Sequence, residues 1–363
     1  MRITLCISSL GQGGAERIAC IMANHWLRRG DAVSIVTLAD AKAVPAYPLD
    51  SGVAVRNLGL AGKTVGAGKL LVNLRRLMAL RRELRRSRPD VVIGFMDTTS
   101  VLALLAAAGA GVPVIAFEHC HPVQFPLGRG WRSLRRLLYP RAAAVVVLGE
   151  EIRRWFEANV GPRRLLVIQN PVPVAGTCGG NPTRSGRVVL GVGRLAEEKR
   201  FHLLLEAFAR VADSHPEWRL EICGEGPERA DIERRIGELG LEDRVVLHGW
   251  VADVTGPMLD ADIFALSSRS EAFPAALCEA MACGLPAVSF DCPSGPAEII
   301  RHGVDGLLAP TGDVAALADG LDRLMGDPGR REAMGRAAAE GIRRFSPEII
   351  MARWDDLFRE VVK

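Results

Sequence analysis

The stretch Ile3-Thr-Leu-Cys-Ile-Ser-Ser-Leu-Gly-Gln-Gly-Gly-Ala-Glu16 runs from a short apolar strand into a glycine-rich loop and the start of a helix. The same rhythm continues with strands expected at 33–38, 90–95, 114–118 and 143–148, each followed by a helical pattern. Continuous apolar strands between amphipathic helices are typical of a parallel sheet covered on both faces. Because no small-residue cleavage site follows the first strand, these residues are expected to belong to the fold and not to a signal peptide.

The strand–helix pattern breaks near Asn170, where prolines and glycines follow over 171–186, and then restarts. Further strands are expected at 187–192, 219–223, 244–248, 263–267, 287–290 and 306–309. A chain of 363 residues is long enough for two domains. The sequence therefore predicts two Rossmann-like domains, 1–172 and 187–345, joined by a linker over 173–186. A helix over 346–363 is expected to pack back on the first domain.

Composition excludes several classes of protein. A content of 48% hydrophobic and 24% charged residues is ordinary for a folded globular chain. The longest apolar stretch, 101–112, is too short for a membrane span and predicts a buried helix. The eight cysteines contain no C-x-x-C pair, which favours free thiols in a reducing compartment over a metal cluster.

Charge is divided unevenly along the chain. Residues 1–175 hold 24 Lys and Arg against 11 Asp and Glu, whereas the remainder holds 22 against 31. Such asymmetry indicates that the first half meets something anionic. The segment 69–88 has leucines at helical spacing with seven arginines and one glutamate, and 129–138 repeats the basic-apolar pattern.

A basic amphipathic helix of this kind is typical of a surface that touches anionic membrane or lipid phosphate. The alternative is a solvated helix whose leucines face the core. Nucleic acid is disfavoured because no recognition motif accompanies the charge. Six residues are assigned to the acceptor or membrane side: Glu16, Arg75, Arg76, Arg82, Arg86 and Trp131.

The glycine loop 9–16 opens a helix, where backbone amides and the helix dipole favour an anion. Glu16 stands where a dinucleotide fingerprint requires glycine, so G-x-G-x-x-G is not completed. The loop thus argues against a nicotinamide cofactor. Phosphate binding, sugar binding and a simple tight turn all stay open.

Two cations flank a second strand-to-helix turn, Gly191-Val-Gly-Arg-Leu-Ala-Glu-Glu-Lys199. Arg194 and Lys199 could together neutralise a diphosphate, the leaving group of a nucleotide sugar, although solvated surface charge is the alternative.

Two glutamates eight positions apart mark a third motif, Arg269-Ser-Glu-Ala-Phe-Pro-Ala-Ala-Leu-Cys-Glu279. Glu279 is expected on a helix among small and apolar neighbours, where a carboxylate could bind ribose hydroxyls. Glu271 and its loop could hold sugar hydroxyls or stabilise developing charge.

In combination these motifs resemble the retaining GT-B glycosyltransferases of family four, which carry E-x7-E, the Arg-plus-Lys pair and an N-terminal glycine loop. The segment Leu220-Glu-Ile-Cys-Gly-Glu-Gly-Pro-Glu-Arg229 is similar to the family's G-x-G-P loop. His248-Gly-Trp-Val251 and Val167-Ile-Gln-Asn-Pro171 are similar to its nucleobase and interdomain segments. The resemblance covers nearly the whole chain and implies two Rossmann-like domains facing across a cleft.

The resemblance also implies roles for single residues. The expected catalytic residues are His119, Glu271, Arg194 and Lys199, with His121 as the competitor of His119. The expected donor-binding residues are Gly13, Gly14, Arg194, Lys199, Val251, Glu271, Phe273 and Glu279. Pro274 departs from the family pattern, because it donates no N–H where a glycine is common. The D-x-D string 260–262 precedes a strand, and the Arg194–Lys199 pair already supplies positive charge, so no metal is expected. No other cofactor is expected, because the nucleotide sugar is a substrate.

The implied reaction is transfer of a hexose or N-acetylhexosamine, with retention of configuration, from a nucleotide diphosphate sugar. The Phe-Pro variant and the segment 291–300 look more like family members that act on UDP-sugars in surface-polysaccharide pathways. The basic amphipathic segments favour a lipid-linked saccharide as the acceptor. The enzyme is expected in the cytoplasm, peripheral on the inner face of the cell membrane. A nucleotide-sugar epimerase of the same architecture is the alternative, and a nicotinamide-dependent dehydrogenase a remote one.

Overall fold

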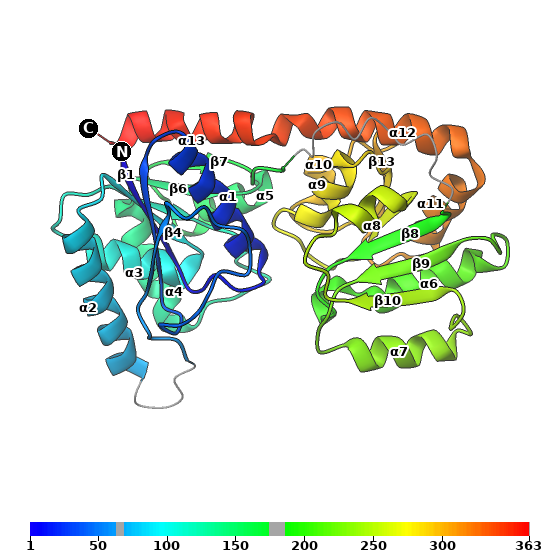
Figure 1. Ribbon diagram of the computed structural model, residues 1–363, viewed down its shortest axis with the longest axis horizontal. Helices are drawn as coiled ribbons and strands as arrows, with labels where there is room; N and C mark the ends of the chain where they lie inside the picture. The colour runs from blue at the N-terminus through cyan, green and yellow to red at the C-terminus, as the bar shows by residue number, and fades with distance from the viewer. Residues whose placement is uncertain (63–68, 174–185, 363) are drawn as a thin grey trace. The chain divides into compact units, whose positions relative to one another are not determined.

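The computed structural model describes residues 1–62, 69–173 and 186–362, with side chains of residues 69 and 70 left out. The chain forms two compact units (Figure 1). The N-terminal unit comprises Met1–Pro171 and Glu348–Lys363, and the C-terminal unit comprises Val172–Pro347. Most of the expected linker, 173–186, lies outside the described residues.

The N-terminal unit contains a seven-stranded parallel sheet in the order β3-β2-β1-β4-β5-β6-β7. Its strands are β1 Arg2–Ile7, β2 Ala32–Thr37, β3 Ala54–Asn57, β4 Val91–Phe95, β5 Val114–Phe117, β6 Ala144–Val147 and β7 Leu165–Val167. The sequence did not predict β3 and β7. Both are short edge strands whose residues stay partly exposed, so they lack the continuous apolar run that marked the central strands.

The helices of this unit are α1 Gly14–Arg28, α2 Lys69–Ser87, α3 Asp97–Ala107, α4 Arg129–Leu138, α5 Glu150–Asn159 and α13 Pro347–Val361, with a 3-10 turn η2 over Tyr139–Arg141. The buried helix expected over 101–112 is α3, most of whose residues are buried. It ends earlier than expected, at Ala107, and Gly109 follows with a φ of 78°. That left-handed conformation suits glycine and closes the helix.

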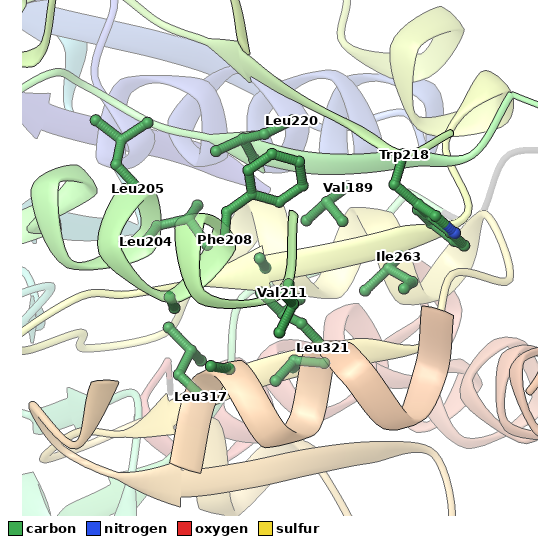
Figure 2. Close-up of a cluster of buried hydrophobic side chains, with 14 of the residues drawn as sticks. Val189, Leu204, Leu205, Phe208, Val211, Trp218, Leu220, Ile263, Leu317 and Leu321 are labelled. Carbon is green, nitrogen blue, oxygen red and sulfur yellow. The ribbon is translucent and has the colours of Figure 1, made fainter. Parts of the chain in front are cut away.

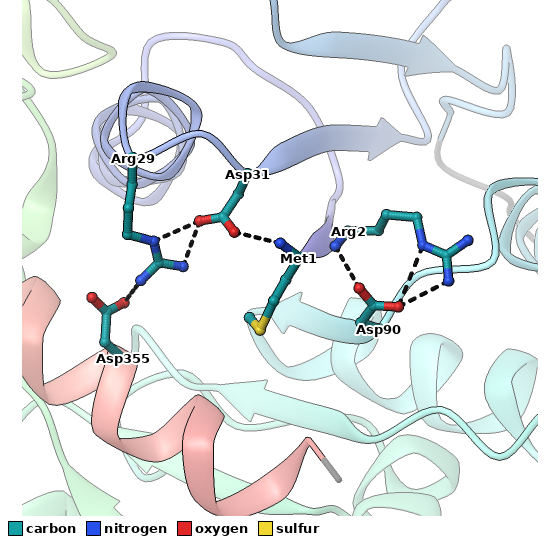
Figure 3. A network of polar contacts seen from close by, with 6 residues as sticks. All are labelled: Met1, Arg2, Arg29, Asp31, Asp90 and Asp355. Carbon is teal, nitrogen blue, oxygen red and sulfur yellow. Dashed lines mark hydrogen bonds and ion pairs between the residues drawn. The ribbon is translucent and has the colours of Figure 1, made fainter.

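Helix α13 packs on α1 through aromatic and charged side chains. Trp354 and Phe358 of α13 contact Trp26 of α1, with ring centroids 6.1 and 5.2 Å from that of Trp26. Figure 3 shows Arg29 bound to both Asp31 and Asp355, beside the separate pair Arg2–Asp90. The chain therefore returns to the N-terminal unit with its last helix.

The C-terminal unit contains a six-stranded parallel sheet in the order β10-β9-β8-β11-β12-β13. Its strands are β8 Val188–Val192, β9 Arg219–Cys223, β10 Val245–Gly249, β11 Ile263–Leu266, β12 Ala287–Asp291 and β13 Gly306–Pro310. Its helices are η3 Glu197–Lys199, α6 Phe201–Ala212, α7 Arg229–Glu238, α8 Thr255–Asp260, α9 Ala275–Ala282, α10 Pro296–Ile299, α11 Val314–Gly326, α12 Pro328–Gly341 and η4 Ile342–Phe345. The two parallel-sheet units confirm the expected fold class.

The core of the C-terminal unit forms where α6 and α11 cover one face of the sheet (Figure 2). Phe208 of α6 and Leu321 of α11 are fully buried together with strand residues such as Leu220 and Ile263. Each such side chain contributes roughly 1.5–3 kcal/mol by leaving water. This packing fixes the sheet whose loops carry the expected donor residues.

Two glycines of the G-x-G-P segment lie directly against the backbone of the turn after β8. A Cβ at Gly224 would lie 1.8 Å from the carbonyl oxygen of Gly193, and one at Gly226 would lie 2.2 Å from that of Leu195. The amides of Gly193 and Leu195 donate to carbonyls of residues 223 and 225, at 3.0 and 3.1 Å. The glycines thus allow two loops to share hydrogen bonds at a distance that no other residue permits.

Replacing Gly224 with alanine should therefore destabilise the protein. Since the neighbouring atoms are backbone and cannot swing aside, we expect Gly224→Ala to lower the free energy of unfolding by about 2 kcal/mol or more. Gly256→Ala in α8 is the matched control, because a Cβ there meets nothing within 4 Å. Urea unfolding of both variants measures the difference, and equal stabilities would contradict the close-approach argument.

Candidate functional site

Three expected donor residues of the C-terminal unit follow the two strands between which the strand order of its sheet reverses. From β8 the chain continues to β9 and β10 on one side, and then crosses to β11 on the other. Strands β8 and β11 are paired neighbours. Arg194 and Lys199 follow β8, and Glu271 follows β11. Ligands of open parallel sheets bind outside the carboxyl ends of the strands at such a reversal.

An ion pair joins the two loops at this edge. The Lys199 Nζ lies 2.5 Å from the Glu271 Oε1, and both side chains are largely buried. Ser268 donates to the same carboxylate oxygen at 2.6 Å, while the Ser267 hydroxyl donates to the Lys199 carbonyl at 2.8 Å. The sequence motifs singled out Lys199 and Glu271 but missed both serines, whose only signal was their position directly after β11.

Arg194 is exposed in the turn that the two close-approach glycines support. Within the described ranges no ion pair or hydrogen bond engages its guanidinium. Lys199 in contrast is held by Glu271. The turn therefore presents one cation to solvent and one that is neutralised by a carboxylate.

The second glutamate and its neighbours have different environments. Glu279 lies half-buried on α9, where a helix was expected. Phe273 is 9% exposed and packs edge-on against Phe345 with ring centroids 5.3 Å apart, so its side chain belongs to the unit's interior. Pro274 is the N-cap of α9, and its ring approaches Gly295, whose φ is 152°.

The segment after β10 carries the residues expected at the nucleobase. Gly249 has a φ of 71°, Trp250 is exposed and Val251 is half-buried. His248 lies 2.8 Å from Glu221, which also accepts from Arg219. The exposed indole of Trp250 was not foreseen as a site residue, although it stood inside the quoted motif.

The glycine loop of the N-terminal unit is covered by Glu16. The Glu16 carboxylate accepts from the Ser9 hydroxyl at 3.2 Å, and a Cβ at Gly13 would lie 2.0 Å from its Oε2. Gly13 is the N-cap of α1, and Gly14 has open space beside its Cα. Gly13 thus makes room for a carboxylate of its own helix, which sequence spacing alone did not indicate.

The two histidines after β5 are distinct. His119 packs between Phe95 and Phe117, with ring centroids 5.2 and 4.1 Å away, and burial lowers its pKa to about 3. His121 is buried, accepts from the Val123 amide through Nδ1 at 3.2 Å and has its Nε2 3.7 Å from Glu151. Burial also lowers the pKa of His121, and Glu151 opposes that effect. His119 is therefore a neutral group held by aromatic rings.

A buried polar cluster lies beside His119 in sequence and was not predicted. The Tyr139 hydroxyl donates to the Glu118 carboxylate, and both residues are buried. Burial, reinforced by the negative charge of Asp97, raises the pKa of Glu118 to about 7. The buried Arg135 guanidinium, 4.9 Å from the Trp155 ring centroid, acts in the opposite direction. Arg135 is thereby a core residue, unlike the other arginines of its basic stretch.

The basic helix α2 has an apolar face that is partly in the core and partly exposed. Leu80 and Leu84 are buried, whereas Leu71, Leu74 and Met78 are 63%, 48% and 62% exposed. The arginines assigned to the acceptor or membrane side divide in the same way. Arg75, Arg82 and Arg86 are exposed, whereas Arg76 donates to the carbonyls of residues 60 and 62 at 3.1 and 2.9 Å. Trp131 of α4 is half-buried.

The D-x-D string 260–262 was considered as a metal ligand, and no metal was expected there. Asp262 is buried and accepts from the Val188 amide at 3.2 Å, which gives its carboxylate a structural role. In the described part of the chain no group of three or more His, Cys, Asp or Glu side chains is arranged to hold a metal ion. The cysteines in that part are free thiols. None of the helices described is both long and apolar enough to cross a bilayer.

Comparison with known proteins gives the family. Residues 12–175 match the model of Glycosyltransferase Family 4, and residues 181–341 match that of Glycosyl transferases group 1. Together the two models span most of the chain. The chain belongs to the group 1 glycosyltransferases and has their GT-B fold.

Three similar proteins illustrate the range of relatives. An exopolysaccharide phosphotransferase of Streptomyces coelicolor is 35% identical over 96% of this chain, which spans only 40% of that relative's length. The Campylobacter jejuni α-1,4-N-acetyl-D-galactosaminyltransferase named for a GalNAc-GalNAc-diNAcBac-PP-undecaprenol acceptor is 28% identical over 99% of both chains. The crystal structure of Anabaena HepE with UDP and glucose superposes with a TM-score of 0.80 at 21% identity, covering 99% of both chains. That last likeness concerns the fold.

Proposed function

We propose that the chain transfers a hexose or N-acetylhexosamine from a UDP-sugar to a lipid-linked saccharide in bacterial glycan synthesis. The observation that carries the proposal is the Lys199–Glu271 ion pair at the strand-order reversal of the C-terminal unit. It brings a cation suited to phosphate and a carboxylate suited to hydroxyls onto adjacent loops. The C. jejuni relative, whose name gives an undecaprenol diphosphate-linked acceptor, supports the choice of acceptor class.

In this proposal the donor diphosphate binds Arg194 and Lys199. Lys199 exchanges its bond to Glu271 for one to phosphate, and Glu271 is thereby released to accept hydroxyls of the donor sugar. Glu279 binds the ribose, and the backbone at Val251 contacts the base. Gly13, Gly14 and His119 are assigned to the donor phosphates and sugar on the family resemblance.

The proposed chemistry breaks the bond between the anomeric carbon and the diphosphate oxygen. The acceptor hydroxyl oxygen attacks on the face that the diphosphate leaves, and its proton passes to the departing phosphate oxygen. Negative charge that develops on the diphosphate is stabilised by Arg194 and Lys199, whose positions are set before the reaction starts. Configuration at the anomeric carbon is retained because attack and departure share one face.

We further propose that α2 binds an anionic membrane surface. Its exposed apolar residues Leu71, Leu74 and Met78 are interspersed with the exposed Arg75 and Arg82. Apolar side chains that enter the headgroup region beside arginines that contact lipid phosphates are the pattern of an interfacial helix. Such docking would bring the enzyme to a membrane-borne acceptor on the inner face of the cell membrane.

The donor assignment predicts that Arg194→Ala and Lys199→Ala each lower kcat by about 100-fold or more, because each removes a charge that stabilises the leaving group. Arg210→Ala is the matched control, since Arg210 is another exposed arginine of the same unit without a hydrogen bond or ion pair among the described residues. Turnover is measured after thermal-shift screening of UDP-, GDP- and ADP-sugars identifies the donor, with lipid-linked saccharides as acceptors. Near-normal turnover of Lys199→Ala would contradict the assignment, and an epimerised donor formed without acceptor would identify an epimerase.

Turnover is also expected to be independent of divalent metal, because two side-chain cations serve the diphosphate in this scheme. Transfer rates in excess EDTA should equal those in added Mg²⁺ or Mn²⁺. Loss of activity in EDTA that is restored by one of these ions would overturn this part of the proposal.

Membrane docking through α2 predicts flotation of the protein with phosphatidylglycerol-containing vesicles but not with phosphatidylcholine vesicles, and release at high salt. The double substitution Leu74→Asp/Met78→Asp should abolish flotation. Val246→Asp/Val304→Asp, on exposed apolar residues of the C-terminal unit, should leave it unchanged. Flotation that survives the α2 substitutions would exclude this face as the docking surface.

A further inference from the structure

A continuous series of aromatic contacts links the C-terminal helix to His119. The His119 ring stacks on Phe95 of β4 at an interplanar angle of 20°, and its other neighbour is Phe117 of β5. Phe117 in turn meets Trp354 of α13 edge-on, with ring centroids 4.9 Å apart. Residues more than 230 positions apart in sequence are thereby in direct contact.

Packing alone orients the His119 ring. Its Nε2 is buried without a partner, and across residues 1–62, 69–173 and 186–362 no hydrogen bond or ion pair engages either ring nitrogen. Most buried imidazoles are fixed by a hydrogen bond from one nitrogen, which also selects the tautomer. Since His119 lacks one, the shape of its aromatic surroundings is what holds the ring.

Helix α13 is itself firmly fixed to the N-terminal unit. Arg29 binds Asp355 next to Trp354 (Figure 3), and Arg353 donates to the Gln169 side chain at 2.8 Å and to the Val167 carbonyl at 2.6 Å. Trp354 is fully buried. Its ring therefore gives Phe117 a firmly held neighbour.

We propose that Trp354 is a positioning residue for His119, acting through Phe117, so that the C-terminal helix supports a site residue of the N-terminal unit. The importance of His119 for transfer rests on the proposed function, whereas its positioning by Trp354 does not. Trp354 keeps the Phe117 ring against His119, whose side chain is half-buried.

The packing around the buried Nε2 of His119 has a measurable electrostatic consequence. Burial is the one cause of the lowered pKa of His119. Burial, and after it the carboxylates of Glu118, Asp97 and Glu16, raise the pKa of the adjacent Cys120, whereas these carboxylates are not among the causes of the His119 shift. A histidine with a lowered pKa favours the folded state fully above its ordinary pKa of 6.5, and this contribution is lost as the pH falls from there toward 3. Loosening the aromatic support should raise the pKa of His119 toward 6.5.

The test compares Trp354→Leu with Trp26→Leu. Both tryptophans are fully buried and contact each other and Phe358, but Trp26 makes no ring contact with Phe117 or His119 among the described aromatic pairs. Both variants should lose similar thermal stability. The titration of His119 is followed by imidazole ¹⁵N NMR in the ligand-free protein, with His119→Gln to assign the signal.

We expect His119 to stay neutral down to about pH 5 in the wild type and in Trp26→Leu, and to titrate between about pH 5 and 6.5 in Trp354→Leu. Trp354→Phe keeps an aromatic ring beside Phe117 and should leave the titration of His119 as in the wild type. An unchanged His119 titration in folded Trp354→Leu, or an equal change in Trp26→Leu, would overturn the proposal.

Activity separates this inference from the proposed function. In Trp354→Leu, kcat should fall by up to about fourfold between pH 7.5 and 6, and further toward pH 5, while the KM for the donor stays unchanged, because a positively charged His119 no longer accepts a hydrogen bond. If the NMR titration appears but kcat has no such pH dependence, the positioning holds and the assigned role of His119 in transfer fails.

Discussion

The ion pair between Lys199 and Glu271 depends on a constraint of the whole C-terminal unit: all strands of its sheet are parallel, and their order reverses between β8 and β11. Parallel strands place all their carboxyl ends at one edge, so loops distant in sequence become neighbours there. The turn after β8 is further fixed by the G-x-G-P segment, whose glycines let two backbones meet at hydrogen-bond distance. The packing of α6 and α11 against the sheet then holds the strands that carry these loops in place.

Much of this architecture could be predicted from the sequence, because central strands of a parallel sheet are buried on both faces and read as apolar runs. Every strand expected from such a run is present. The missed strands, β3 and β7, lie at the sheet edges and expose part of their side chains. These strands are not buried on both faces, so they lack the continuous apolar run by which the other strands were predicted.

The site could be predicted only as a set of residue types. Lys199 and Glu271 were identified separately, as a phosphate ligand and a sugar ligand, and nothing in their spacing indicated that they bind each other. Likewise nothing in the sequence indicated that the Phe273 ring packs on Phe345. The buried Glu118–Tyr139 bond and the aromatic surroundings of His119 were also missed. The first joins the end of β5 to the turn η2, and the second depends on the pairing of β4 with β5. Sequence motifs thus report which chemistry is available, whereas contacts decide how each group is held.

The bond between Lys199 and Glu271 has a consequence for selectivity. In the absence of donor each residue is the other's ligand, so the site contains a built-in competitor. An incoming anion must outweigh a short, largely buried charge pair before it gains anything from Lys199. A single phosphate or a chloride ion offers the lysine a replacement but offers the released carboxylate nothing. Under the proposed function, a nucleotide sugar would supply both partners at once, a diphosphate for the cation and hydroxyl donors for Glu271. The pair would then act as a threshold against the small anions of the cell and would lower the affinity for the donor.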